Sequence, residues 1–138
     1  MTQPLNIPTS NKIGILTLFL GVSCVGLMIK LPPIFRSIDK EMHFLFFLFS
    51  AAFVNVLFGN GKVVPHIVIF IALLFFGYFI EHAQEFSNRF FAKRIHGNFD
   101  PEDLKYNSMG LTLFSVLWFF NTITLKLFHF LYKRNSHE

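Results

Sequence analysis

Three carboxylates and one histidine in this chain have the residue types needed for acid/base chemistry. Asp39 and His43 are four residues apart, a spacing that places both side chains on one face of a helix. Histidine changes its charge near neutral pH, and neighbouring carboxylates can take up or return its proton. We therefore interpret four residues as candidate catalytic groups for acid/base chemistry or proton relay: Asp39, His43, Glu81 and Asp103.

Further polar residues flank these four and are candidates for holding a ligand. Amide side chains both donate and accept hydrogen bonds and can orient a ligand, while arginine and lysine suit a phosphate or another anion. The candidate binding residues are Lys40, Gln84, Glu85, Arg89, Arg94 and Asn107. The alternative interpretation is that these polar residues form only interhelical ion pairs and helix caps.

A metal site is a further alternative, because carboxylates together with a histidine suit Mg²⁺, Mn²⁺ or Zn²⁺. Its ligands would come from Asp39, His43, Glu81 or Asp103. The sequence contains no compact ligand signature such as His-Glu-x-x-His. We therefore predict no metal residues and no cofactor, and a divalent metal stays the alternative.

The composition indicates which elements must position these residues. Of the 138 residues, 53% are hydrophobic and 21 are Phe, and the mean hydropathy is +0.51, which is more than a soluble domain of this size can bury. A membrane-spanning helix needs about 20 mostly apolar residues. Four stretches meet this standard, at 13–29, 42–58, 64–80 and about 109–130. They predict an all-α integral membrane protein, a four-helix bundle with a polar pocket at one interface.

The acidic residues are unevenly distributed: seven of the eight fall in two short segments, 36–41 and 81–106. In a chain with four membrane helices, the connections after the first and third helices share a side. Connectivity therefore places both segments on one side, and His66 and His129 at the opposite interface. The twelve Lys and Arg are spread over loops and helix ends rather than along one groove, which argues against a nucleic acid partner.

Local signals set the expected boundaries. Asp100 before Pro101 is a helix start, Ser37 is a candidate N-cap for the second helix, and 59–62 is a tight turn. The expected helices are 13–29, 38–58, 64–86 and 101–131. Around the membrane domain at 13–131, we expect an N-terminal tail at 1–12 and a C-terminal tail at 132–138.

Several of these residues follow one another in an order that a known family shares. Asp39-Lys40 is followed by His43-Phe44, Glu81-x-x-Gln84, arginines, and Asp103-x-x-x-Asn107-x-x-Gly110 at the head of the last membrane helix. In this order the motifs resemble the VanZ-like family of small multi-pass bacterial membrane proteins, over about residues 37–117. Two features depart from the family pattern. The interval from Gln84 to Asp103 is longer than usual, so either Arg89 or Arg94 matches the motif arginine, and Phe114 stands where a second small residue is common.

The resemblance implies a location and a class of ligand. It implies a multi-pass protein of the bacterial plasma membrane, with both termini cytoplasmic and a link to resistance against the glycopeptide antibiotic teicoplanin. We expect it to bind or act on an envelope lipid or a lipid-linked head group. Two alternatives are a metal-assisted or acid/base lipid-phosphate hydrolase, and a structural subunit of a membrane protein complex.

Overall fold

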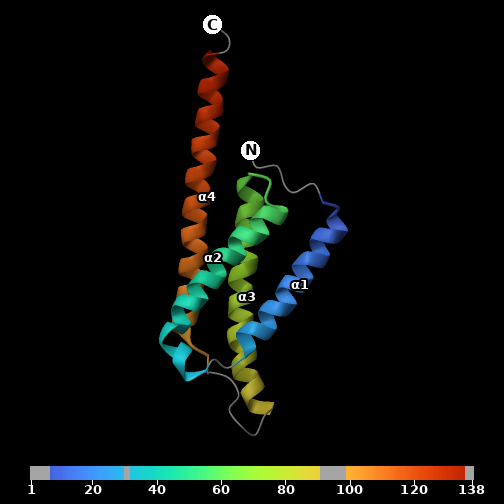
Figure 1. Ribbon diagram of the computed structural model, residues 1–138, viewed down its shortest axis with the longest axis vertical. Coiled ribbons are helices and arrows are strands. Elements are labelled where there is room, and N and C mark those ends of the chain that lie inside the picture. The colour runs from blue at the N-terminus through green and yellow to red at the C-terminus, as the bar shows by residue number, and fades with distance from the viewer. Residues whose placement is uncertain (1–6, 30–31, 91–98, 136–138) are drawn as a thin grey trace.

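The chain folds into four helices, with no strand in the part that the structure describes. In the computed structural model this part comprises residues 7–29, 32–90 and 99–135. The elements, in chain order, are α1 (Thr9–Met28), the 3₁₀ turn η1 (Pro33–Ile38), α2 (Asp39–Phe58), α3 (Val63–Phe90) and α4 (Pro101–Asn135). The helices pack together as an all-α four-helix bundle (Figure 1), which confirms the predicted fold class.

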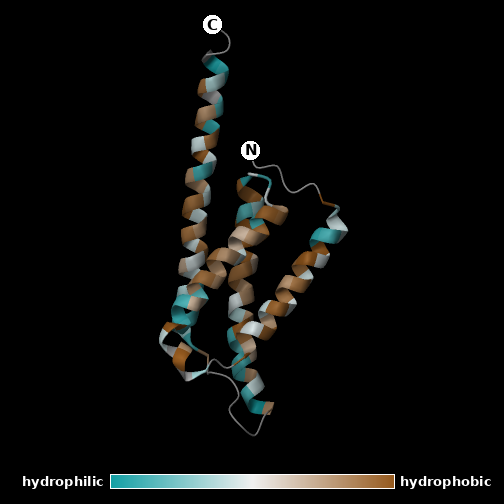
Figure 2. Cartoon of the chain, viewed as in Figure 1, coloured by the Kyte–Doolittle hydropathy of each residue, from teal (hydrophilic) through white to brown (hydrophobic). Residues whose placement is uncertain are grey.

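Each of the four helices is long and apolar enough to cross a membrane, judged by its length and composition. Large apolar side chains point outward: Phe49, Phe75 and Phe120 are 65%, 68% and 74% exposed. Hydrophobic residues line the middle of α2 and α3, and hydrophilic residues gather near the ends (Figure 2). Such a surface is unfavourable in water and favourable against the hydrocarbon of a bilayer.

Three helix boundaries lie several residues from the expected ones. Helix α1 begins at Thr9 rather than at residue 13, because the backbone N–H groups of Asn11 and Lys12 both donate to the Pro8 carbonyl, at 3.0 and 3.1 Å. Helices α3 and α4 continue past residues 86 and 131, to Phe90 and Asn135. The apolar pattern that set the expected ends stops before these residues, whereas the helical backbone hydrogen bonding continues into the polar sequence.

Ser37 does not cap α2, contrary to the expectation. The residue before α2 is Ile38, and no side chain caps this helix end. A 3₁₀ turn forms first, with the Phe35 N–H donating to the Pro32 carbonyl at 2.9 Å, and it runs directly into α2. Ser37 therefore lies inside a turn and not at a helix start.

Both other local signals agree with the structure. Asp100 caps α4, because its Oδ1 accepts the N–H of Glu102 at 2.8 Å. Between α2 and α3, Gly61 has a φ of 70°, and the Lys62 N–H donates to Asn60 Oδ1 at 3.1 Å. This left-handed conformation favours glycine, and the turn makes α2 and α3 an antiparallel hairpin.

Helices α2 and α4 cross with their backbones in contact at Gly110. A Cβ atom on Gly110 would collide with the Phe44 carbonyl oxygen of α2. A Cβ atom on Gly77 of α3 would lie 2.9 Å from both the Asn107 amide and the Phe47 ring. Glycine at these two positions therefore lets three helices approach closely.

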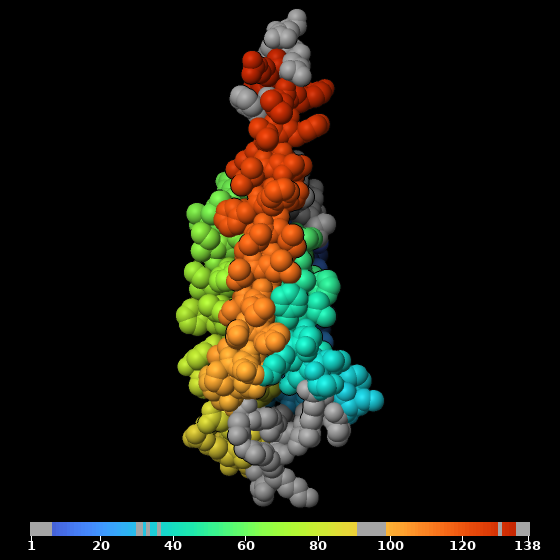
Figure 3. Space-filling model, turned by 90° about the vertical axis from the view of Figure 1, so that its left-hand side faces the viewer, coloured from blue at the N-terminus to red at the C-terminus, as the bar shows by residue number. Residues whose placement is uncertain are grey.

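The apolar core lies along this three-helix contact. Its buried members are Phe47, Ala51, Val54, Ile69, Leu73 and Leu111. Helix α4 lies along the face between α2 and α3, and its C-terminal end extends beyond both of them (Figure 3). The core thus fixes the relative positions of α2, α3 and α4, the helices that carry the candidate site residues.

Candidate functional site

The polar ends of three helices meet at one end of the bundle. The first turns of α2 and α4 lie there together with the C-terminal part of α3 (Figure 1). This end is hydrophilic, in contrast to the middle of the helices (Figure 2). Residues from the two acidic segments are therefore brought together in space.

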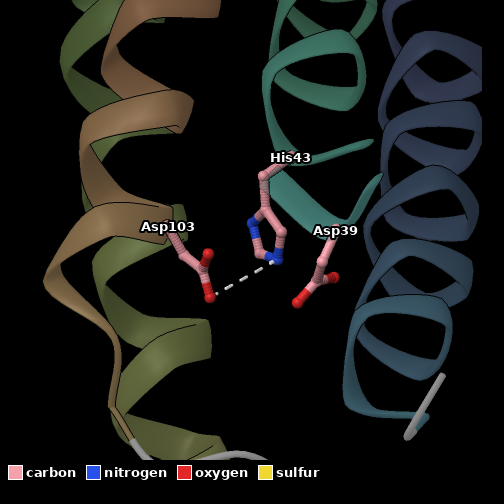
Figure 4. A group of neighbouring side chains, drawn as sticks. All are labelled: Asp39, His43 and Asp103. Carbon is pink, nitrogen blue, oxygen red and sulfur yellow. Dashed lines mark ion pairs between the residues drawn. The ribbon is translucent and has the colours of Figure 1, made fainter. Parts of the chain in front are cut away.

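Asp39 and His43 of α2 and Asp103 of α4 form the centre of this end. Their side chains point toward one another (Figure 4), and one ligand atom from each lies within 4.8 Å of the other two. His43 Nε2 is 4.0 Å from Asp103 Oδ2. His43 and Asp103 are buried, whereas Asp39 is half-buried, so the group reaches the surface at Asp39.

Asn107 fixes the orientation of the His43 ring from the other side. His43 Nδ1 lies 3.0 Å from Asn107 Oδ1, in a buried contact between α2 and α4. An amide oxygen only accepts hydrogen bonds, so the proton of the neutral ring is on Nδ1. The lone pair of Nε2 then faces the two aspartates.

Glu81 joins α3 to the start of α4. It is fully buried, and its Oε2 accepts the N–H of Asp100 at 3.3 Å. Glu81 also lies within electrostatic range of Asp103 and His43. All four candidate catalytic residues therefore belong to one group of side chains, although they come from three helices.

We call Asp39, His43, Glu81, Asp103 and Asn107 the polar cluster. Three of its buried atoms have no hydrogen-bond partner within the described ranges: Glu81 Oε1, Asp103 Oδ1 and Asn107 Nδ2. Leaving a buried polar group unpaired costs about 1–3 kcal/mol, and folded proteins rarely do so. Two buried acceptors and one buried donor thus have unmet hydrogen-bonding capacity.

The basic candidate residues that the structure describes lie outside the cluster. Lys40 forms an ion pair with Glu102 of α4. Arg89 Nη2 lies 3.5 Å from Glu85 Oε1, one turn earlier on the exposed part of α3. Lys40 and Arg89 therefore each already have a carboxylate partner, and Glu85 pairs with Arg89 at the surface.

Gln84 has a structural contact. Its Nε2 donates to the Leu27 carbonyl at 2.8 Å and so ties α3 to the end of α1. Arg94 lies outside the described residues. Among the predicted binding residues that the structure describes, only Asn107 belongs to the polar cluster.

A second buried polar group lies toward the opposite end of the bundle, and sequence reasoning missed it. His66, in the first turn of α3, is 3% exposed and enclosed by the bundle, whereas its place at the membrane interface stays a prediction. Its Nδ1 is 3.1 Å from Asn55 Oδ1, its Nε2 is 3.0 Å from Ser115 Oγ, and its ring stacks on Trp118 at a centroid distance of 4.2 Å. His129, the other residue expected there, is exposed on α4.

A physical reason accounts for the burial and bonding of His66. A histidine in an apolar environment lowers its free energy by bonding to polar groups of neighbouring helices. The available signal was Asn55, an amide inside an otherwise apolar stretch, with Ser115 in the last helix. Such polar residues commonly form hydrogen bonds between membrane helices.

No protein-family model, curated protein or solved structure matches this chain. The resemblance to the VanZ-like family therefore stays a prediction.

The polar cluster combines a histidine, three carboxylates and an amide at the end of a membrane-type bundle. The His43 ring is oriented by a hydrogen bond and its Nε2 lies 4.0 Å from Asp103 Oδ2, so a bridging ligand or a small side-chain rotation would connect the two for proton transfer. The unpaired acceptors suit hydroxyl or amine donors, or a cation. The site thus has the capacity to bind a polar ligand, and its histidine has the surroundings that acid/base chemistry needs.

Proposed function

We propose that this chain is a VanZ-like membrane protein that binds the head group of an envelope lipid or of a lipid-linked molecule in the polar cluster. One observation carries the proposal. Two buried carboxylates, Glu81 and Asp103, each keep an oxygen without a hydrogen-bond partner in the described part of the chain. A ligand with hydroxyl or amine donors would satisfy these oxygens.

The charge of the cluster favours some head groups over others. Glu81 and Asp103 repel a bare phosphate, and Lys40 and Arg89 are paired with other carboxylates. Sugars, amino sugars and ethanolamine carry the hydroxyl and amine donors that the free acceptors need. We therefore expect selection for donor-rich head groups over simple anionic ones.

The surface of α2 supports a lipid as the ligand. Met42, Leu45 and Phe49 of α2 follow at intervals of three and four residues and are exposed, at 40%, 46% and 65%, and Ile38, the last residue of η1, lies just before them and is 44% exposed. This spacing places them on one side of the helix, next to half-buried Asp39. An acyl chain would lie along this stripe while the head group enters at Asp39.

The cellular setting is part of the same proposal. The chain would be a multi-pass protein of the bacterial plasma membrane, with both termini in the cytoplasm and the polar cluster facing the envelope. A contribution to teicoplanin resistance would follow if the bound lipid belongs to the cell-wall assembly that the antibiotic targets.

Lipid analysis of the purified chain tests the head-group proposal. The protein is extracted in mild detergent, and co-purifying lipids are identified by mass spectrometry beside those of the source membrane. We expect one donor-rich lipid class to be enriched with the wild type and with Glu41→Gln, an exposed acid in the first turn of α2. The enrichment should be lost with Glu81→Gln and Asp103→Asn. A wild-type lipid profile equal to that of the source membrane would refute the proposal.

A second candidate function is an acid/base hydrolase of a lipid phosphate, and the geometry of His43 favours it. The ring is held by Asn107 through Nδ1, so the lone pair of Nε2 is left available to act as a general base on a bound substrate. Turnover of a panel of lipid phosphates by the purified chain tests this function. Loss of turnover with His43→Gln is expected, and an inactive wild type counts against it.

A further inference from the structure

We propose that Asp39, His43 and Asp103 bind one divalent transition-metal ion of the Zn²⁺ or Mn²⁺ type. These three side chains converge from α2 and α4, and their ligand atoms lie within 4.8 Å of one another (Figure 4). The inference concerns the same polar cluster as the proposed head-group site. It rests on the geometry of the three ligands and stands without the lipid.

The spacing of the ligand atoms is close to that of a loaded site. At the usual metal–ligand distances of about 2.0–2.2 Å, two ligand atoms on a tetrahedral ion are roughly 3.4 Å apart. His43 Nε2 and Asp103 Oδ2 are separated by 4.0 Å, so a small side-chain rotation brings both onto one ion. Asp39 is half-buried in the first turn of α2, where its side chain has room to follow.

The burial of Asp103 and its unpaired oxygen are the independent observation that points to a cation. This residue is 8% exposed, and its Oδ1 has no hydrogen-bond partner among the residues the structure describes. Its side chain points into the group formed with His43 and Asp39 (Figure 4). A buried carboxylate that stays ionised needs hydrogen bonds or a positive charge, and a metal ion supplies the charge.

His43 is prepared as a metal ligand by its contact with Asn107. The bond from Nδ1 to Asn107 Oδ1 fixes the tautomer and leaves the lone pair on Nε2. Metal-binding histidines commonly donate their other ring N–H to an oxygen in this way, which orients the ring. Asn107 would thus support the metal ion without touching it.

The ligand types select the ion. Mg²⁺ and Ca²⁺ prefer oxygen ligands only, whereas an imidazole with two carboxylates suits Zn²⁺ or Mn²⁺. Two aspartates balance the charge of a divalent ion. Three protein ligands leave a coordination position open, and a hydroxyl oxygen of the head group would bind there.

Titration of the full-length chain in detergent with Co²⁺ tests the inference, because Co²⁺ bound in place of Zn²⁺ has a visible absorption band. The protein is first stripped with a chelator, and no lipid ligand is added. We expect saturation at one Co²⁺ per chain, displacement of the band by Zn²⁺ and persistence of the band in Mg²⁺. Asp39→Asn, His43→Gln and Asp103→Asn should each lose the band, while the matched acid variant Glu41→Gln keeps it.

Asp39→Asn is the decisive variant, because the half-buried position in the first turn of α2 tolerates an amide without disturbing the core. Its helix content and elution volume should equal those of the wild type. The inference is overturned if the wild type gives no saturable band, if Asp39→Asn binds Co²⁺ as the wild type does, or if Glu41→Gln loses binding equally. Any of these results leaves the lipid analysis unaffected, so the metal and head-group proposals fail separately.

Discussion

Asn107 links the chemistry of the polar cluster to the packing of the bundle. Its Oδ1 orients His43, and its Nδ2 lies against Gly77 of α3 with no hydrogen-bond partner in the described part of the chain. One amide therefore contacts both neighbouring helices. Replacement of Asn107 should therefore weaken metal binding by His43 while the four helices still fold.

We predict that Asn107→Leu weakens Co²⁺ binding about 10- to 100-fold, the usual effect of removing the residue that orients a metal-binding histidine. The side chain is similar in size, but the acceptor for His43 Nδ1 is lost. Asn107→Asp keeps an acceptor and should retain binding. The Co²⁺ titration described above measures both variants, and equal binding by Asn107→Leu and the wild type would contradict the role of Asn107.

Glu81 leads to a prediction about stability. Its Oε1 is buried without a partner in the described residues, and its side chain is fully enclosed. Glu81→Gln keeps an oxygen for the Asp100 N–H and removes the buried carboxylate, so the free energy of unfolding should rise by about 1 kcal/mol or more.

Thermal unfolding in detergent, followed by circular dichroism, measures this change. The matched control is Glu85→Gln on the exposed part of α3, for which we expect a change within about 0.5 kcal/mol. A gain in stability together with lost lipid enrichment would identify Glu81 as a residue kept for function. A lower unfolding temperature for Glu81→Gln would contradict this interpretation.

Residue types and spacing predicted part of the candidate site. Asp39 and His43 share a helix face because they are four residues apart, and helix order brings Asp103 into their group and Glu81 within electrostatic range of Asp103 and His43. The partners of Lys40 and Gln84 could not be read from the sequence. They depend on the angles at which helices cross, and these angles follow from packing contacts that a linear pattern does not contain.

At the scale of elements, the crossing of α2 and α4 depends on one glycine. Gly110 places its Cα against the Phe44 carbonyl, directly beside the polar cluster. The same crossing sets the distance between His43 on α2 and Asp103 on α4. A change in the way α2 and α4 cross should therefore alter both the free energy of unfolding and the distance between His43 and Asp103.

We predict that Gly110→Ala lowers the free energy of unfolding by about 1–3 kcal/mol, because the added methyl group meets a backbone atom that has no room to move. The control is Gly26→Ala in α1, where an added Cβ has no atom within 4 Å. Its stability should stay equal or rise by up to about 1 kcal/mol, from helix propensity alone. Thermal unfolding of both variants in the same detergent measures the difference. Equal stability of the two variants would contradict the close contact between Gly110 and the Phe44 carbonyl.

The existence of four helices was predictable, whereas some of their ends were not. A run of about 20 apolar residues has few stable alternatives to a helix in a membrane, so composition is sufficient to expect the element. The ends at Phe90 and Asn135 lie in polar sequence, where hydropathy carries no signal. Asp100 is the exception, since its cap is a local hydrogen bond that the residues Asp100-Pro101 encode directly.

At the scale of the whole molecule, connectivity determines which residues share a side of the membrane. The polar cluster lies at the end opposite the turn between α2 and α3 (Figure 1). With four crossings and both termini in the cytoplasm, as we propose, Glu41 and Glu85 would face the envelope and Asn60 the cytoplasm.

Cysteine labelling in intact cells tests this orientation. The background is Cys24→Ser, which removes the one native cysteine. We predict that Glu41→Cys reacts with a membrane-impermeant maleimide in intact cells, whereas Asn60→Cys reacts only after permeabilisation. The reverse pattern would place the cluster in the cytoplasm, and labelling of both positions in intact cells would contradict the four-crossing topology.

The length of α4 has a consequence for the surrounding lipid. This helix has 35 residues and therefore measures about 52 Å, against roughly 30 Å for the hydrocarbon of a bilayer, and its C-terminal end rises past the turn between α2 and α3 (Figure 1). Its exposed side chains include apolar residues as far as Leu131 and Tyr132, with Lys126 and His129 interspersed. A bilayer that covers the apolar residues near the end of α4 and also ends level with the α2–α3 turn must be thicker beside α4 than beside that turn. The protein would then impose a thickness gradient on its own annulus of lipid, at a cost of fractions of a kcal/mol per Å of mismatch, and would concentrate where the membrane already varies in thickness.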